Sequence, residues 1–74
     1  MISKKTMEQY EAVRKSGVTN MFDYYAVIRA AEWWKFYSLA SLTSKDYKEL
    51  LMNFGKLMKK YNIKQLKSGE QNDK

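Results

Sequence analysis

A short corner early in the chain limits how this protein can fold, because one helix stops and another starts between residues 16 and 23. Gly17 can adopt the left-handed conformation that closes a helix at its C-terminus. Asn20 is expected to cap the next helix, and the negative charge of Asp23 suits the positive end of that helix's dipole. The corner therefore predicts two successive helices with little chain between them.

The apolar residues recur at helical spacing, and the chain contains no proline, so we predict an all-α fold. Three helices are expected, over about residues 4–16, 21–40 and 44–61, and they should form one compact domain over residues 1–63. Residues 64–74 carry one large apolar side chain. This last segment is expected to be a disordered, basic and polar tail.

The third expected helix has the clearest pattern, because its apolar residues follow the i, i+3, i+4, i+7 spacing of a single helix face. Thr43 or Ser44 is expected to cap its start, and Asn62 can adopt the left-handed conformation that ends it. Gly55, inside the helix, costs about 1 kcal/mol relative to alanine, which predicts the close approach of another helix. The expected core positions are Tyr47, Leu50, Leu51, Phe54, Leu57, Met58 and Tyr61.

The second expected helix is apolar around nearly its whole circumference. One apolar stripe runs from Tyr24 to Trp34, and further aromatic residues cover much of the opposite side. A helix of this kind is buried nearly all round, and two partner helices in so short a chain can hardly cover it. We therefore expect either that it forms the interface of a homo-oligomeric helical bundle or that its second face is a ligand surface. The expected interface residues are Trp33, Trp34, Phe36 and Tyr37.

The composition excludes several classes of site. Small domains usually add disulfides, a metal or a partner subunit to a limited core, and this chain has no cysteine and no histidine. Disulfides, ordinary zinc sites, a histidine base and a cysteine nucleophile are therefore excluded, and no glycine-rich phosphate loop is present. Asp23 and Glu32 lie about 13 Å apart along one helix, too far for a carboxylate pair. We expect no enzymatic activity, no metal and no cofactor.

No apolar run approaches the roughly 20 residues that span a membrane, so we expect a soluble, cytoplasmic protein. The net charge of +6 at pH 7 favours anionic partners. Twelve of the fourteen basic residues are lysines, whereas the bidentate recognition of bases is mostly an arginine function. Nucleic-acid binding is therefore a third possibility, behind small anions and proteins.

The basic and aromatic residues of the corner and of the second helix form a candidate site for an anionic ligand. Aromatic faces stack on nucleobases and nearby cations attract phosphate, which together give the ordinary chemistry of nucleotide capture. The alternative is that the same aromatics are core and subunit interface, and both hold if the pocket lies between subunits. In the ligand-binding hypothesis, Arg14, Arg29 and Lys35 supply charge, Tyr24, Tyr25 and Trp33 supply stacking, and Thr19 and Asn20 supply polar contacts.

The run from Arg14 to Asp23 has the pattern R-x-S-G-x-T-N-M-F-D and is followed by Val27 and Ala31. It resembles a family of small bacteriophage proteins of unknown function, over roughly the first half of the chain. The resemblance implies a phage origin, and the family offers no established activity or catalytic residues to carry over to this chain. By analogy with other small helical phage proteins, the resemblance also implies the binding of a host component.

These observations lead to a first hypothesis and an alternative. The first is a non-enzymatic phage counter-defence protein in the host cytoplasm, which binds a host anionic small molecule such as a cyclic or ADP-ribose-type nucleotide immune signal. The alternative is a protein-interaction module that inhibits or regulates a host or phage protein.

Overall fold

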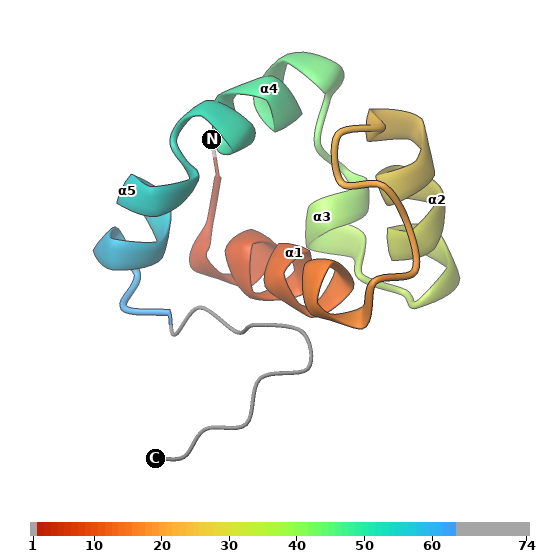
Figure 1. Ribbon diagram of the computed structural model, residues 1–74, viewed down its shortest axis with the longest axis horizontal. Helices are drawn as coiled ribbons and strands as arrows, with labels where there is room; N and C mark the ends of the chain where they lie inside the picture. Colours follow the sequence, from red (N-terminus) through yellow and green to blue (C-terminus); the bar gives the residue numbers. More distant parts are fainter. Residues whose placement is uncertain (1, 64–74) are drawn as a thin grey trace.

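The computed structural model describes residues 2–63, and the regular secondary structure of this part of the chain consists of α-helices joined by short loops, with no strand among these residues (Figure 1). The predicted all-α class is therefore confirmed, with five helices in place of the three expected. The expected tail, residues 64–74, lies outside the described residues. The helices are α1 (Lys4–Ser16), α2 (Tyr24–Trp33), α3 (Tyr37–Ala40), α4 (Ser44–Met52) and α5 (Phe54–Lys60).

Helix α1 ends where the sequence predicts. Gly17 has a φ of 69° and a ψ of 17°, and its N–H donates to the carbonyl of Arg14. This left-handed closure is accessible to glycine without steric cost. At the other end the hydroxyl of Ser3 accepts a hydrogen bond from the N–H of Thr6 at 3.1 Å, which satisfies one of the free donors of the first turn.

Helix α2 begins later than expected, and Asn20 does not cap it. The cap is Asp23, whose carboxylate accepts from the N–H of Ala26 at 3.2 Å. The side chain of Asn20 accepts instead from the N–H of Phe22 at 2.9 Å, and so closes a turn ahead of the helix. The prediction for Asn20 was wrong because a side-chain amide satisfies a nearby turn as readily as a helix end.

The expected helix over residues 21–40 is interrupted by a left-handed residue, Lys35, with a φ of 62°. The N–H of Phe36 donates to the carbonyl of Ala31 at 2.7 Å, and the N–H of Lys35 donates to Glu32 at 3.1 Å. These two bonds make a Schellman closure of α2, after which the chain turns into α3. Apolar spacing continues through the break, so periodicity alone did not indicate it.

The expected third helix is divided at Asn53 into α4 and α5, which point in different directions (Figure 1). The side-chain amide of Asn53 donates to the carbonyl of Glu49 at 3.0 Å and competes with the backbone ladder. Thr43 caps α4 and Asn62 is left-handed with a φ of 56°, as predicted. A Cβ atom at Gly55 would meet nothing within 4 Å, so the predicted close approach of another helix was wrong.

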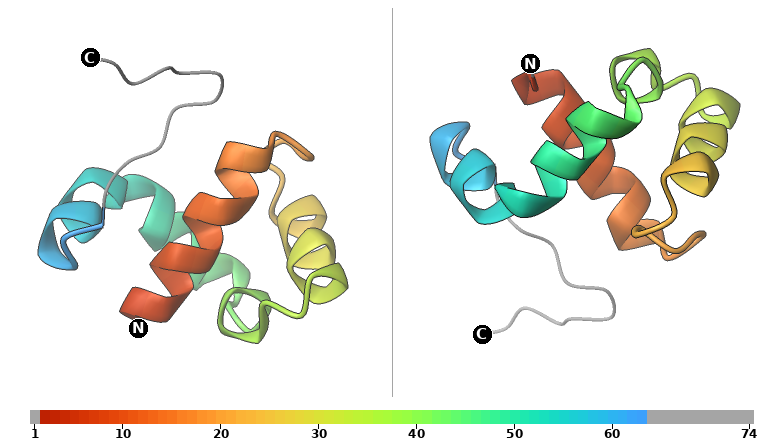
Figure 2. Two further views of the ribbon diagram at one scale, coloured as in Figure 1. Left: turned by 90° about the horizontal axis from the view of Figure 1, so that it is seen from below. Right: turned by 90° about the horizontal axis from the view of Figure 1, so that it is seen from above.

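The core lies between α1, α4 and the α2–α3 pair, and α2 forms one edge of the molecule (Figures 1 and 2). The seven apolar positions expected in the third helix all lie in this core or against it, which confirms that prediction. Tyrosine hydroxyls connect distant segments. Tyr24 donates to the carbonyl of Leu42 at 2.6 Å, Tyr61 donates to that of Ile2 at 2.7 Å, and Tyr47 donates to that of Met21.

Candidate ligand-binding site

A groove of about 370 Å³ lies between the outer side of α2 and the loop that precedes this helix. We call it the α2 groove. It contains three of the eight residues that the sequence indicated as ligand contacts, namely Thr19, Arg29 and Trp33. Its full lining is Val18, Thr19, Ala26, Arg29, Ala30, Trp33 and Trp34.

Helical periodicity explains why these residues meet. One face of α2 carries Ala26, Arg29, Ala30 and Trp33, which follow the i, i+3, i+4, i+7 spacing of a helix. The two alanines have short side chains and so leave space on this face of the helix. The neighbouring Trp33 side chain is 83 % exposed. Gly17 ends α1 and turns the chain so that Val18 and Thr19 form the opposite wall.

The electrostatics of the α2 groove favour an anion. Arg29 is the one charged residue in the lining, and it forms no ion pair with any acidic residue of the described part of the chain. Thr19 adds a hydroxyl that can donate or accept a hydrogen bond. The groove therefore combines a free guanidinium, a hydroxyl and an exposed indole.

The other residues predicted as ligand contacts lie elsewhere. Arg14 is paired with Glu11 at 2.6 Å and its guanidinium lies 6.0 Å from the ring centre of Phe54. The hydrogen bond from Arg14 to Glu11 raises the pKa of Arg14. Tyr24 is half-buried and its ring packs 5.8 Å from that of Tyr47. These contacts give Arg14 and Tyr24 roles in holding the fold.

The remaining three predicted contacts are exposed but do not line the groove. Asn20 closes the turn before α2, and Lys35 follows the end of that helix. Tyr25 is 70 % exposed on the outer side of α2, four residues before Arg29. It is a neighbour of the α2 groove, whereas Arg14 and Tyr24 are engaged by other residues of the chain.

Of the four residues predicted as an oligomer interface, two are exposed and two are half-buried. Trp33 and Tyr37 are 83 % and 64 % exposed. Trp34 and Phe36 are half-buried, pack edge to face with ring centres 5.6 Å apart, and contact the core. Of the predicted interface, Trp33 and Tyr37 are therefore available to a partner, whereas Trp34 and Phe36 are engaged with the core.

Sequence reasoning missed Val18, Ala26 and Ala30 as lining residues and Phe22 as an exposed aromatic. The spacing of the two alanines was a usable signal, because small residues four apart beside a tryptophan leave a depression on a helix face. Nothing local distinguishes Phe22, which is 83 % exposed, from a core phenylalanine.

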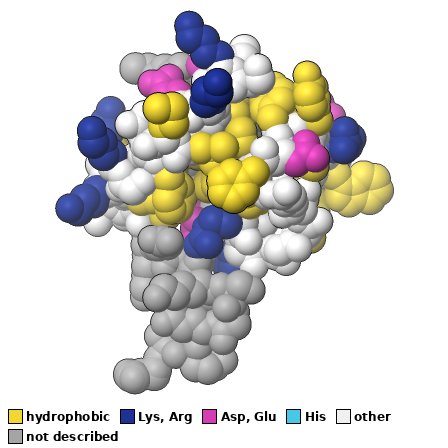
Figure 3. All heavy atoms as spheres, turned by 45° about the horizontal axis from the view of Figure 1, so that its top comes forward, with side chains coloured by type: hydrophobic (Ala, Val, Ile, Leu, Met, Phe, Trp, Pro, Cys, Tyr) yellow, Lys and Arg dark blue, Asp and Glu magenta, His cyan; other side chains and the backbone are white. Residues whose placement is uncertain are grey.

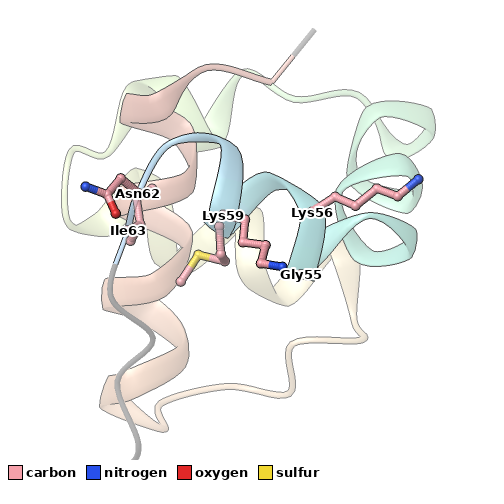
Figure 4. Close-up of a pocket in the computed structure, with 6 residues that line it drawn as sticks. Gly55, Lys56, Lys59, Asn62 and Ile63 are labelled. Carbon is pink, nitrogen blue, oxygen red and sulfur yellow. The ribbon is translucent and has the colours of Figure 1, made fainter.

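A larger hollow of about 560 Å³ lies beside α5, between Gly55 and Ile63. Its polar side chains do not converge, since Lys56 extends to one side and Asn62 to the other (Figure 4). The α2 groove is the better candidate for a site.

Two other kinds of site find no support in residues 2–63. No group of three or more acidic, histidine or cysteine side chains there could hold a metal ion. Among the described helices, none is both long enough and apolar enough to cross a membrane.

Comparison with known families places the chain in an uncharacterised group. The family model described as a domain of unknown function (DUF5049) matches residues 2–55, so the chain belongs to that family. The match spans α1 to α4 and includes every residue that lines the α2 groove. Neither a curated protein nor a solved structure matches the chain.

Proposed function

We propose that this member of the DUF5049 family is a non-enzymatic binding protein whose α2 groove holds an anionic ligand that carries a planar ring. The observation behind the proposal is that Arg29 and Trp33 line one groove that contains no acidic side chain. An indole face supports a base or another flat ring, and a guanidinium binds phosphate through two parallel hydrogen bonds.

The size of the groove agrees with a ligand of this class. Small-molecule sites typically enclose about 300–1,000 Å³, and the α2 groove, at about 370 Å³, lies at the lower end of that range. A groove of this size holds one ring and one phosphate group, so in this proposal one base and one phosphate of a larger nucleotide occupy it and the rest of the ligand lies outside. Thr19 lines the opposite wall, and in this proposal its hydroxyl contacts a sugar or a phosphate oxygen.

A nucleotide is the ligand that best combines a planar ring with a phosphate. The resemblance to phage proteins suggests that such a nucleotide would be bound in an infected host cell. In this proposal the protein comes from a phage and works in the host cytoplasm. It sequesters a nucleotide immune signal of the cyclic or ADP-ribose type, without chemical change. The exposed aromatic side chains around the groove favour assembly into a homo-oligomer.

Calorimetry with ADP-ribose and with a cyclic dinucleotide tests the proposal. Arg29→Gln should weaken binding of the preferred nucleotide by at least about tenfold, because a charge-assisted contact to phosphate is lost. The control is Lys59→Ala with Lys60→Ala, which removes two charges from α5, outside the groove, and should leave the affinity unchanged. If the lysine pair matters and Arg29 does not, the α2 groove is not the site.

A second candidate function is the binding of a host or phage protein. Phe22 and Tyr37 are 83 % and 64 % exposed and neither lines the groove. Exposed aromatic residues are typical of protein contacts. If neither nucleotide binds, and Phe22→Ser abolishes the capture of a specific protein that Met52→Ser still captures, this second function replaces the first.

A further inference from the structure

Helix α5 carries the most uneven charge of the described helices. Its sequence contains three lysines, Lys56, Lys59 and Lys60, and no acidic residue. The three lysines are exposed and follow the i, i+3, i+4 spacing of one helix face. None of them forms an ion pair with an acidic residue among residues 2–63, although Glu49 shares a smaller hollow with Lys60. We call these three residues the α5 lysine face.

The preceding helix, α4, carries its charges differently. Its two lysines, Lys45 and Lys48, are balanced by two acidic residues. On α5 nothing balances the lysines, and like charges four positions apart destabilise a helix. Basic side chains project at the left edge of the space-filling view, where α5 lies (Figure 3). The stability of α5 therefore does not explain the charge of this face.

Gly55, directly before the lysine face, is also unexplained by the described part of the chain. Glycine destabilises a helix relative to alanine, yet the φ of Gly55 is not positive and a Cβ atom there would meet nothing within 4 Å. Such a glycine allows another molecule to approach the backbone closely. Gly55, Lys56 and Lys59 line the same hollow of about 560 Å³, so open space and positive charge occur together.

The directions of the side chains favour an extended anion over a small one. Lys56 and Lys59 point in different directions, and Asn62 extends to the far side of the hollow (Figure 4). A small anion needs donors that converge on it, whereas cations that are spread apart can each meet a different phosphate of a polymer. Lys56 and Lys60 are about 6 Å apart along the helix axis, and duplex DNA carries one negative charge for about every 1.7 Å of its axis. Each lysine can therefore contact a phosphate of its own.

We propose that the α5 lysine face binds the phosphate backbone of double-helical nucleic acid, which lies against Gly55 and is held without regard to its sequence. Lysine binds phosphate as a point charge, and contacts to phosphate carry no sequence information. This function is separate from the α2 groove, because none of the three lysines lines that groove. All three also lie beyond residues 2–55, which the family model matches.

The surroundings of the lysines favour a duplex over other anionic partners. Single strands are held largely by stacking on aromatic side chains, and helices that bind a membrane surface insert an apolar face. The apolar residues of α5 serve neither purpose, because Phe54, Leu57 and Met58 pack in or against the core. Protein interfaces are depleted of lysine. A face of lysines alone is suited to the regular, highly charged backbone of a duplex.

Fluorescence anisotropy with a short labelled DNA duplex of mixed sequence tests the inference. Three phosphate contacts predict a slope of about −2.7 for the logarithm of the binding constant against the logarithm of salt concentration. The affinity should therefore fall about 40-fold between about 50 and 200 mM salt. A duplex of unrelated sequence should bind within about twofold of the first, and a preference above about tenfold would overturn binding through the backbone alone.

Two paired substitutions of equal charge locate the contact. Lys59→Ala with Lys60→Ala should make the slope shallower by about 1.8 and weaken binding in low salt by at least about tenfold. Lys45→Ala with Lys48→Ala removes the same charge from exposed positions on α4 and should change the affinity by less than about twofold, because salt screens charges that make no contact. Equal losses from both pairs would show that net charge alone attracts the duplex, and would overturn the site. Circular dichroism of each variant confirms that the fold is retained.

Gly55→Leu tests the close approach without changing the charge. Leucine favours a helix and the space above Gly55 is open, so the fold should be retained. The new side chain would occupy the surface against which the duplex lies, so the affinity should fall by at least about fivefold. An unchanged affinity would overturn the proposed position of the duplex.

The remaining outcomes separate this inference from its alternatives and from the proposed function. Tighter binding of a single strand than of the duplex would overturn the choice of a duplex. So would binding to phosphatidylserine vesicles, but not to the duplex, that requires Lys59 and Lys60. If Arg29→Gln abolishes duplex binding and the α5 pair does not, the duplex occupies the α2 groove and the lysine face is overturned. Failure of ADP-ribose and of the cyclic dinucleotide to bind would end the proposed function, while salt-dependent duplex binding through Lys59 and Lys60 would still support this inference.

Discussion

The aromatic side chains of the core and those of α2's outer side are chemically alike, but the fold uses them in opposite ways. In the core, Tyr47 is 2 % exposed and its ring packs against Tyr10 and Tyr24. On the outer side of α2, Trp33 is 83 % exposed. The hydroxyls of Tyr24 and Tyr47 donate to backbone carbonyls of distant segments, whereas the outer aromatics present their surface to solvent.

The difference shows that a buried tyrosine acts as a connector as well as an apolar filler. Its ring supplies contact area, and its hydroxyl satisfies a carbonyl that a loop would otherwise leave unpaired. The exposed Trp33 contributes little burial within the chain, and its open surface is available for contact with another molecule. Substitutions in the two regions should therefore affect different measurements.

The largest effect on stability should come from Leu50→Ala, at the centre of the core. Leu50 is fully buried, and truncation of such a leucine costs about 3 kcal/mol through lost burial and a residual cavity. Met52→Ala, two residues later on the same helix but exposed, should change stability by less than about 0.5 kcal/mol. Urea unfolding followed by circular dichroism measures both. If both variants lost the same free energy of unfolding, the distinction between buried and exposed positions of α4 would be wrong.

A smaller effect is expected from Glu11→Gln, which alters the buried charge of α1. The Glu11 side chain accepts two hydrogen bonds from Arg14, at 2.8 Å and 2.6 Å, and the residue is 2 % exposed. Loss of charge from such a pair should cost about 2 kcal/mol. Glu8→Gln, on the same helix but exposed, is the matched control and should be nearly neutral. Chemical unfolding that shows no difference between the two variants would contradict this role.

Tyr47→Phe should cost about 1 kcal/mol, because the hydrogen bond to the carbonyl of Met21 is lost while the ring remains. Burial, together with the neighbouring Tyr10, raises the pKa of Tyr47 above its ordinary value of 10.0. A raised pKa means that the folded state keeps the phenolic proton more firmly than the unfolded state. Stability should therefore hold below about pH 10 and fall as the pH rises beyond it.

Thermal melts between pH 8 and pH 11 test the sign of this dependence. Tyr47→Phe should flatten the alkaline fall, whereas Tyr25→Phe, at a tyrosine that is 70 % exposed, should not. A stability that rises with pH in this window would be incompatible with a proton held by burial of Tyr47.

The smallest effect on stability is expected for Trp33→Glu. Trp33 is 83 % exposed, so the change should alter the free energy of unfolding by less than about 0.5 kcal/mol. Binding of an anionic nucleotide should nevertheless be lost, because stacking is removed and a negative charge is placed beside Arg29. Calorimetry measures the loss of nucleotide binding, and urea unfolding of the same sample measures the change in stability. A large loss of stability would mean that Trp33 belongs to the core.

The sequence predicted only part of the candidate site, because contacts elsewhere in the fold engage some of the predicted residues. Aromatic and basic residue types indicated Arg29 and Trp33, and the structure places both in the α2 groove. The same reasoning included Arg14 and Tyr24, which are held by Glu11 and by the carbonyl of Leu42. Sequence shows which side chains have the right chemistry, but a partner elsewhere in the fold decides whether that chemistry remains free.

The sequence by itself determined the all-α class, the end of α1 at Gly17, the cap of α4 at Thr43 and the core face of the last two helices. These features depend on interactions within one or two helical turns, which neighbouring residues specify completely. Only the tertiary structure decided that α2 ends before Lys35 and that one of its two apolar sides stays uncovered. Apolar spacing runs through Lys35 and does not mark the end of α2, and a helix with two apolar sides gives no local signal of which side its own chain will cover.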